Sequence, residues 1–130
     1  MSDPALVHEI LRQLLQATST IIRRFTAIDS VDDFTSSDAG LEKLDAMCMQ
    51  LIAIGESLKN LDKITEGALL AQYPEVPWKR VMGMRDVLSH HYFDLDAEVV
   101  YNVCEMHIPA LAATLGKMQR GLDRQYYMHC

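Results

Sequence analysis

Residues 38–64, DAGLEKLDAMCMQLIAIGESLKNLDKI, decide the fold of this chain. Their apolar side chains recur every three or four positions, which is the spacing of one buried stripe on an α-helix. The stripe consists of Leu41, Leu44, Cys48, Leu51, Ile54, Leu58 and Leu61. We therefore expect one helix from Asp38 to Ile64. Gly55 lies inside it and costs about 1 kcal/mol relative to Ala, which predicts close approach of another backbone at this point.

The segment before this helix predicts another long helix, from Pro4 to Ile28, with Pro4 in its first turn. Its apolar stripe consists of Leu6, Ile10, Leu14, Ile21, Phe25 and Ile28. Asp29 to Ser37 is polar and is predicted to be a connection between the two helices.

The segment after residue 64 begins with a short amphipathic piece from Ala68 to Tyr73. Pro74 and Pro77 then forbid a continuous helix and form a stiff elbow, which we expect Trp78 to anchor on the bundle. Pro77 starts a third long helix, which should end between residues 91 and 93. The apolar positions of this helix are Val81, Met82, Met84, Val87 and Leu88.

Asp94 or Asp96 is the predicted N-cap of the fourth long helix, which Pro109 should kink. Its apolar positions are Val99, Val100, Val103, Leu111, Leu115 and Met118. Every long stretch of the chain has a period near 3.6 rather than 2, and the connections are short. The predicted fold is all-α, an up-and-down four-helix bundle with a short extra helix before the elbow.

Length and composition fit one domain over residues 1–130, because 49% of the residues are hydrophobic and 23% are charged. No stretch has the build of a signal peptide or of a membrane span, so we expect a cytoplasmic protein without a membrane partner. Cys48, Cys104 and Cys130 are odd in number and widely spaced. They predict neither a disulfide framework nor a metal or redox motif.

The formal net charge of −6 argues against a nucleic-acid partner at first sight. Residues 29–45 carry a formal charge of −5, so the remainder of the chain carries about −1. Lys79, Arg80 and Arg85 form one local basic cluster, and a second one near the end of the chain consists of Lys117, Arg120 and Arg124. This distribution leaves RNA binding possible without indicating it.

The residues best suited to chemistry lie in the run 85–94, RDVLSHHYFD, at the predicted end of the third helix. Arg85 and Tyr92 share one face of an ideal helix, whereas His90 lies about 140° from Arg85. If the helix loosens after Ser89, His90 and Tyr92 fall on the same side instead. Polar groups at this end could also simply cap the last carbonyls of the helix.

Other kinds of site find less support in the sequence. A metal site from His90, His91 and Asp94 lacks the H-x-x-x-H spacing that places two ligands on one helix face. The remaining histidines, His8, His107 and His129, are isolated. No phosphate-binding glycine loop, nucleophile elbow or paired-carboxylate motif occurs.

The run 74–93, PEVPWKRVMGMRDVLSHHYF, resembles the signature stretch of HepT-like proteins, which belong to the HEPN superfamily. Its R-x-x-x-x-H-x-Y pattern is met at Arg85, His90 and Tyr92. The I-G-E step at residues 54–56 and the Ile-Pro pair at 108–109 extend the resemblance over about residues 44–115. His91 stands where relatives often carry an acid, and Asp94 stands where a small residue is common.

The resemblance implies a HEPN-like bundle that acts as a homodimer and as a metal-independent endoribonuclease, the toxin of a bacterial toxin–antitoxin pair. It implies an RNA substrate, no DNA and no cofactor. Arg85 and His90 would be catalytic, and Asp86 and Glu56 would support them. Tyr92 would receive AMP from a cognate minimal nucleotidyltransferase, which silences the toxin.

The residues suit this chemistry. RNA carries its own nucleophile, the 2′-hydroxyl, so that an enzyme needs a proton-transferring group and a fixed positive charge. Histidine and arginine supply these. Two other interpretations stay open, namely a non-catalytic helical partner of a nucleotidyltransferase and a metal-dependent hydrolase.

Overall fold

The computed structural model describes residues 3–90 and 96–128, without the side chains of residues 89–90 and 125–128. Its described part is helical and contains no strand. The helices are α1 (Pro4–Phe25), α2 (Asp32–Thr35), α3 (Asp38–Ile64), α4 (Ala68–Ala71), α5 (Trp78–His90), α6 (Ala97–Asn102), the π-helical turn η2 (Val103–His107) and α7 (Ile108–Met128). This confirms the predicted all-α fold.

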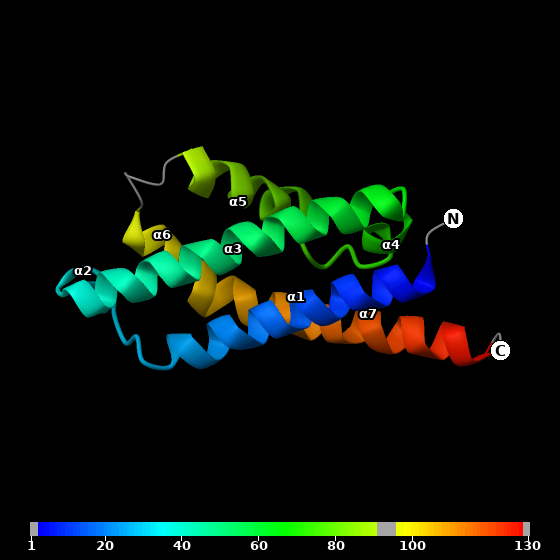
Figure 1. The fold of residues 1–130 in the computed structure, drawn as a ribbon, viewed down its shortest axis with the longest axis horizontal. Coiled ribbons are helices and arrows are strands. Elements are labelled where there is room, and N and C mark those ends of the chain that lie inside the picture. Colours follow the sequence, from blue (N-terminus) through cyan, green and yellow to red (C-terminus); the bar gives the residue numbers. More distant parts are fainter. Residues whose placement is uncertain (1–2, 91–95, 129–130) are drawn as a thin grey trace.

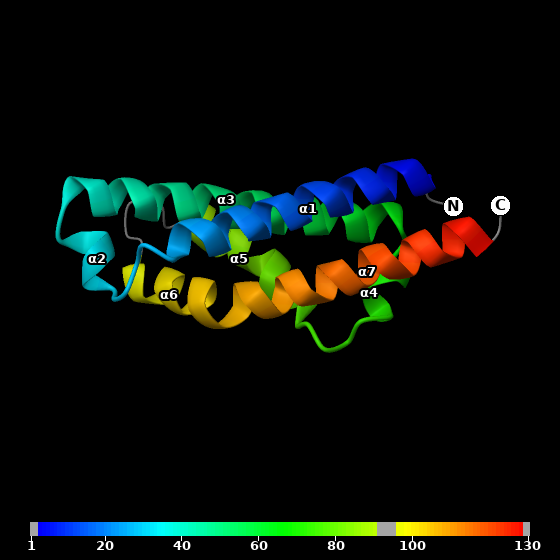
Figure 2. The same cartoon turned by 90° about the horizontal axis from the view of Figure 1, so that it is seen from below.

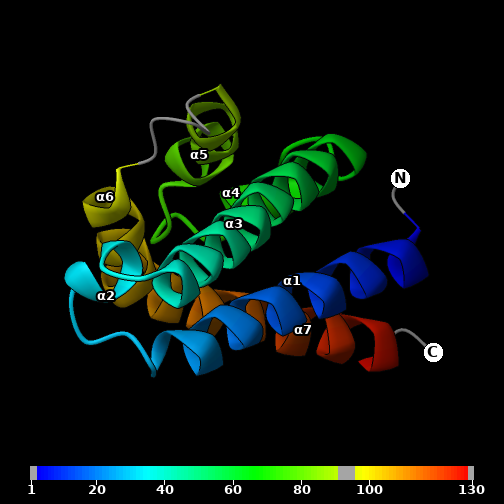
Figure 3. The ribbon, with the colours of Figure 1, turned by 60° about the vertical axis from the view of Figure 1, so that its left-hand side comes forward.

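The long helices run up and down along one axis (Figures 1 and 2). Helix α1 packs against α3 and α7, and α3 also packs against α5. Figure 1 shows α5 running along α3, on the side away from α1 and α7, which can also be followed in Figure 3. The helix α3 is therefore central, which explains why its sequence carries a long apolar stripe.

The bounds of α3 are those predicted from its stripe. Ser37 caps its first turn by accepting a hydrogen bond from the Gly40 N–H at 3.0 Å. Six of the seven predicted stripe residues are buried, but Leu41 is 43% exposed. It lies in the first turn of α3, near one end of the bundle.

Helix α1 differs from its prediction in two respects. It ends at Phe25 rather than at Ile28, and Leu6 is 46% exposed instead of buried. Val7, Leu11 and Thr18 are buried in addition to the predicted residues. The physical reason is that α1 packs against two helices at once, which makes its buried face broader than one stripe and rotates it away from Leu6.

The predicted polar connection between α1 and α3 contains the short helix α2, which the sequence analysis missed. Phe34 is fully buried there and anchors the turn in the core. The Asp33 carboxylate accepts hydrogen bonds from the backbone N–H groups of Asp29 and Ser30, at 2.7 and 3.3 Å. One apolar ring in a polar segment was the available signal.

The proline elbow and α4 form as predicted. Trp78 is 9% exposed, and its indole N–H donates to the Tyr73 carbonyl oxygen at 2.8 Å. The ring thus holds the start of α5 against the bundle. Glu75 in the elbow lies 3.5 Å from the Lys117 ammonium of α7, which links the two segments at the surface.

The predicted fourth long helix is divided into α6, η2 and α7. Asp96 is the N-cap, and its carboxylate accepts from the Glu98 N–H at 3.0 Å; Asp94 lies outside the described residues. Just before Pro109 the backbone widens into the π-helical turn, and the Ile108 N–H reaches back five residues to Val103. The irregularity expected from Pro109 takes this form, because proline has no N–H for the regular helical bond.

Within the described residues, no helix combines the length and the apolar character that crossing a membrane requires.

Candidate active site

Arg85 lies on α5 at a close approach to Gly55 of α3. A β-carbon built on Gly55 would lie 2.7 Å from the Arg85 Cβ and 3.4 Å from the Val81 carbonyl oxygen. Real Cβ atoms do not approach one another this closely, so a glycine at position 55 permits the observed packing. The close approach predicted at Gly55 is confirmed, and the helix that makes it carries the arginine of the motif.

Two carboxylates hold the Arg85 guanidinium. The Asp86 carboxylate, 2.7 Å from Nη1, accepts a hydrogen bond from it. A Glu56 oxygen on α3 lies 2.7 Å from Nε and forms an ion pair with the guanidinium. Both supporting acids predicted from the sequence touch Arg85.

The charge of Arg85 is permanent in this setting. The Asp86 hydrogen bond and the nearby Glu56 carboxylate raise the pKa of the Arg85 guanidinium above its ordinary value. About a third of the side chain is exposed, so the cation is fixed by its partners and still meets solvent. A fixed, accessible guanidinium is suited to stabilising negative charge on a phosphate.

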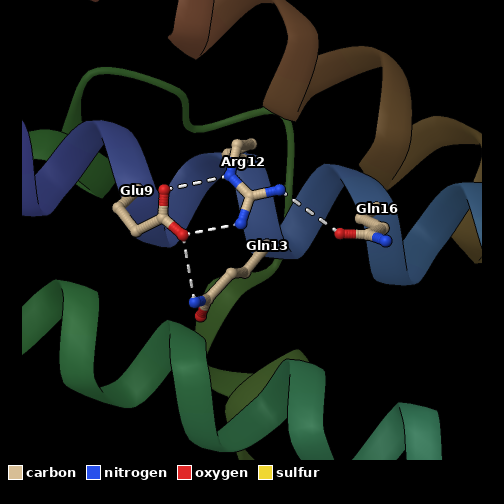
Figure 4. A network of polar contacts seen from close by, with 4 residues as sticks. All are labelled: Glu9, Arg12, Gln13 and Gln16. Carbon is tan, nitrogen blue, oxygen red and sulfur yellow. Dashed lines mark hydrogen bonds and ion pairs between the residues drawn. The ribbon is translucent and has the colours of Figure 1, made fainter.

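A second arginine of the chain shows how different a merely local pair is. On α1, Arg12 donates to both oxygens of Glu9, at 2.9 and 2.6 Å, and Gln13 and Gln16 complete an exposed network on the same helix (Figure 4). Such a pair stabilises one turn of helix slightly. The Glu56 contact of Arg85 instead joins two helices and sets where the guanidinium lies.

A groove of about 690 Å³ opens between α3 and α5 beside this arginine. Its α3 wall and its α5 wall each follow one helix face, and both walls start at a carboxylate that contacts Arg85. The lining residues are Glu56, Lys59, Asn60, Asp62 and Lys63 from α3, with Lys79, Met82, Gly83 and Asp86 from α5. Lys79 belongs to the basic cluster noted in the sequence, whereas Lys59, Lys63 and Gly83 were not singled out.

His90 is the last residue of α5, so the backbone stays helical through this position. Positions 85 and 90 therefore lie about 140° apart around the helix axis. The alternative, in which the chain loosens after Ser89 and brings His90 and Tyr92 to one side, involves residues outside the described part and stays a prediction. The His90 side chain lies outside the described part, as do Tyr92 and the other residues of the metal alternative, His91 and Asp94. How these side chains stand relative to Arg85 stays a prediction.

The other chemically interesting side chains lie away from this site. His8 contacts Asp123 at 2.6 Å and links α1 to α7. Cys48 and Cys104 are buried, and desolvation raises their thiol pKa to about 11 and about 12. Among the residues described here, no group of three or more His, Cys, Asp or Glu side chains could hold a metal ion.

Comparison with known families gives the identity. A family model described as "Ribonuclease HepT-like" matches residues 14–118, which include Glu56, Arg85 and His90. The chain belongs to the HepT-like ribonuclease family. This confirms the family resemblance and the class of enzyme, a ribonuclease of the HEPN type.

Several relatives of this HepT-like chain are ribonucleases by name. "Putative RNase TTE0752" of Caldanaerobacter subterraneus subsp. tengcongensis is 35% identical over 101 residues, 78% of this chain and 83% of that protein. "Putative RNase MJ0127" of Methanocaldococcus jannaschii is 33% identical over 103 residues, 79% and 78% of the two chains. "Probable ribonuclease HepT" of Thermococcus cleftensis is 32% identical over 75 residues, 58% of this chain and 64% of that protein. No solved structure matches the chain.

Proposed function

We propose that this HepT-like chain is the toxin of a toxin–antitoxin pair, a metal-independent endoribonuclease in which Arg85 and His90 act on a phosphodiester of RNA. The observation that carries the proposal is the Arg85 guanidinium. It is fixed by two carboxylates at 2.7 Å, lies beside an open groove, and precedes the motif histidine by five residues on the same helix.

The chemistry needs no group beyond these residues and the RNA. His90 takes the proton of a 2′-hydroxyl, the 2′-oxygen bonds to the adjacent phosphorus, and the bond from phosphorus to the 5′-oxygen breaks. The leaving 5′-oxygen takes up the proton that His90 has accepted, which leaves a 2′,3′-cyclic phosphate and a 5′-hydroxyl and returns His90 to its neutral form. Arg85 stabilises the additional negative charge on the phosphate oxygens in the transition state.

A homodimer is part of this proposal. Positions 85 and 90 lie about 140° apart on one helix, so a single α5 does not present both to one phosphate along one stripe. Two copies of the motif that meet across a two-fold axis place an arginine and a histidine in one shared cleft. The alternative interpretation, a non-catalytic partner of a nucleotidyltransferase, does not explain why part of the Arg85 guanidinium is accessible to solvent beside a groove.

Regulation by a cognate nucleotidyltransferase completes the proposal. The Tyr92 hydroxyl oxygen would attack the α-phosphorus of ATP, release pyrophosphate and become AMP-tyrosine. Its phosphate, two residues from His90, would pair with Arg85 and exclude RNA by charge and by volume. The support for this step is the family resemblance and the position of Tyr92 in the motif.

Co-expression tests both parts of the proposal. Expression of the chain alone should slow bacterial growth and yield RNA fragments with cyclic phosphate ends. With the nucleotidyltransferase present, mass spectrometry should find AMP on the Tyr92 peptide, and Tyr92→Phe should restore toxicity. Full neutralisation of Tyr92→Phe would show that the partner acts by binding alone, and harmless expression of the unmodified chain would refute the toxin assignment.

A further inference from the structure

We propose that the groove between α3 and α5 binds the sugar-phosphate backbone of the single-stranded RNA that flanks the cleaved bond, through Lys59, Lys63 and Lys79. The inference rests on the proposed ribonuclease function and adds where the substrate lies. It starts from position, because Glu56 and Asp86, which hold Arg85, are also lining residues of this groove. A strand in the groove therefore has Arg85 at one end.

The walls are regular. Along α3 the lining residues are spaced so that Glu56, Lys59 and Lys63 share one face, and along α5 the same spacing relates Lys79, Gly83 and Asp86. From Glu56 to Lys63 the groove follows α3 for roughly 10 Å. The lining runs from Glu56 and Asp86 toward the end of α3 and the start of α5, away from the His90 end of α5. In Figure 1 this end of α3 lies next to α4. Its volume of about 690 Å³ is typical of grooves that take small ligands.

The lysines along the groove favour an anion as its ligand. The three lysines are exposed, and within the part of the chain that the structure describes none of their ammonium groups makes an ion pair. Together with Arg85 they outnumber the three lining acids by one, in a chain whose formal net charge is −6. Two of those acids are engaged with Arg85. The lysines are thus available for phosphates.

The lining residues also predict which parts of an RNA strand the groove contacts. Among the described residues, its lining has no aromatic side chain on which a base could stack, so these contacts fall on phosphate and sugar and depend little on sequence. Gly83 leaves the α5 wall open, since a β-carbon built there meets nothing within 4 Å. A side chain at this position would fill the groove without a clash in the protein.

Binding should be measured with a fluorescein-labelled 12-mer of mixed sequence in which every ribose is 2′-O-methylated, so that no variant can cleave it. The variant Lys59→Gln/Lys63→Gln/Lys79→Gln should bind about tenfold more weakly, and its salt dependence should flatten by about 0.7 in log–log slope per lysine. The matched control Lys117→Gln/Arg120→Gln/Arg124→Gln changes the net charge equally, on α7. It should stay within about twofold of the wild type.

Gly83→Gln is a second variant that does not alter the lysines. It should fold with an unchanged or higher Tm, because glycine inside a helix is destabilising, and still bind the RNA probe more weakly. Lysine variants that bind like the wild type, or a control triple that weakens binding as much, would overturn the proposal. Unweakened binding by folded Gly83→Gln would also overturn it.

Kinetics separates this inference from the proposed function. On cleavable RNA the lysine variant should raise KM and keep kcat, whereas Arg85→Ala should lower kcat. If Arg85→Ala cleaves normally while the lysine variant still binds weakly, the catalytic assignment is wrong and the groove stands. If Arg85→Ala is inactive and the lysine variant has a normal KM, the groove assignment is wrong and the catalytic one stands.

Discussion

Gly55 of α3 faces Arg85 of α5 so closely that a β-carbon on the glycine would lie 2.7 Å from the Arg85 Cβ. The next residue on α3, Glu56, contacts the guanidinium of the same arginine at 2.7 Å. One two-residue step of α3 therefore supplies both the space that Arg85 occupies and a carboxylate that fixes it.

Gly55→Ala should destabilise the protein although alanine is the better helix former. Overpacking of this kind costs about 1–3 kcal/mol, and the helical gain offsets about 0.5–1 kcal/mol of it. Urea unfolding measures the difference. Gly83→Ala, on the facing helix with open space around it, is the matched control for stability and should stabilise by about 0.5–1 kcal/mol. Equal stabilisation by both substitutions would show that α3 and α5 are not held this closely.

Glu56→Gln tests Glu56 as a positioning residue. The variant keeps the size of the side chain and removes the charge that holds Nε, so we expect kcat to fall about tenfold with little change in KM or in the free energy of unfolding. Steady-state kinetics and urea unfolding measure these quantities. Glu42→Gln, an exposed acid near the start of α3, should leave kcat unchanged. A parallel loss of stability, or an unchanged kcat, would reduce Glu56 to a structural role.

The sequence predicts most of the fold because burial follows one period along α3. It does not predict how α1 packs between two helices, so Leu6 was predicted to be buried but is exposed. It also does not predict that Phe34, which lies in a polar segment, is buried. Such features depend on which elements pack together. The fourth helix is divided by a π-helical turn for the local reason that Pro109 lacks an N–H, yet its form was not foreseen.

The candidate site was likewise predicted only in part. Arg85, Asp86 and Glu56 stand out in the sequence because they belong to motifs, and the structure brings these three together. The sequence does not predict the groove, because Lys59 and Lys63 are four residues apart, which is the pattern of an ordinary solvent-exposed helix face. Only the packing of α3 against α5 places them opposite Lys79.

The proposed shared cleft predicts subunit complementation. Light scattering at micromolar concentration should give the mass of a dimer. Mixing Arg85→Ala and His90→Ala subunits, each inactive alone, should restore activity, because a mixed dimer contributes one intact arginine and one intact histidine. A strictly monomeric mass, or mixed dimers without activity, would contradict the composite site.

The two buried thiols should be unreactive in the native protein. Burial raises the pKa of Cys48 to about 11 and of Cys104 to about 12, from 9.0, so the reactive thiolate is absent at neutral pH. Since the folded state disfavours their ionisation, stability should fall as the pH rises above 9 toward these values. Iodoacetamide labelling with peptide mapping should modify both residues in urea and neither at pH 7.5. Rapid native labelling would contradict the burial of both thiols in the core.

The central claim is that Arg85 and His90 cleave RNA without a metal, and the most direct measurement is the cleavage rate of one defined RNA in excess EDTA. The wild type and an Arg120→Ala control on α7 should cut it at the same rate, with or without the chelator. Arg85→Ala and His90→Ala, shown to be folded by circular dichroism, should each be slower by about 100-fold or more. Cleavage that EDTA abolishes, or a rate within a few-fold of wild type in either variant, would contradict the account.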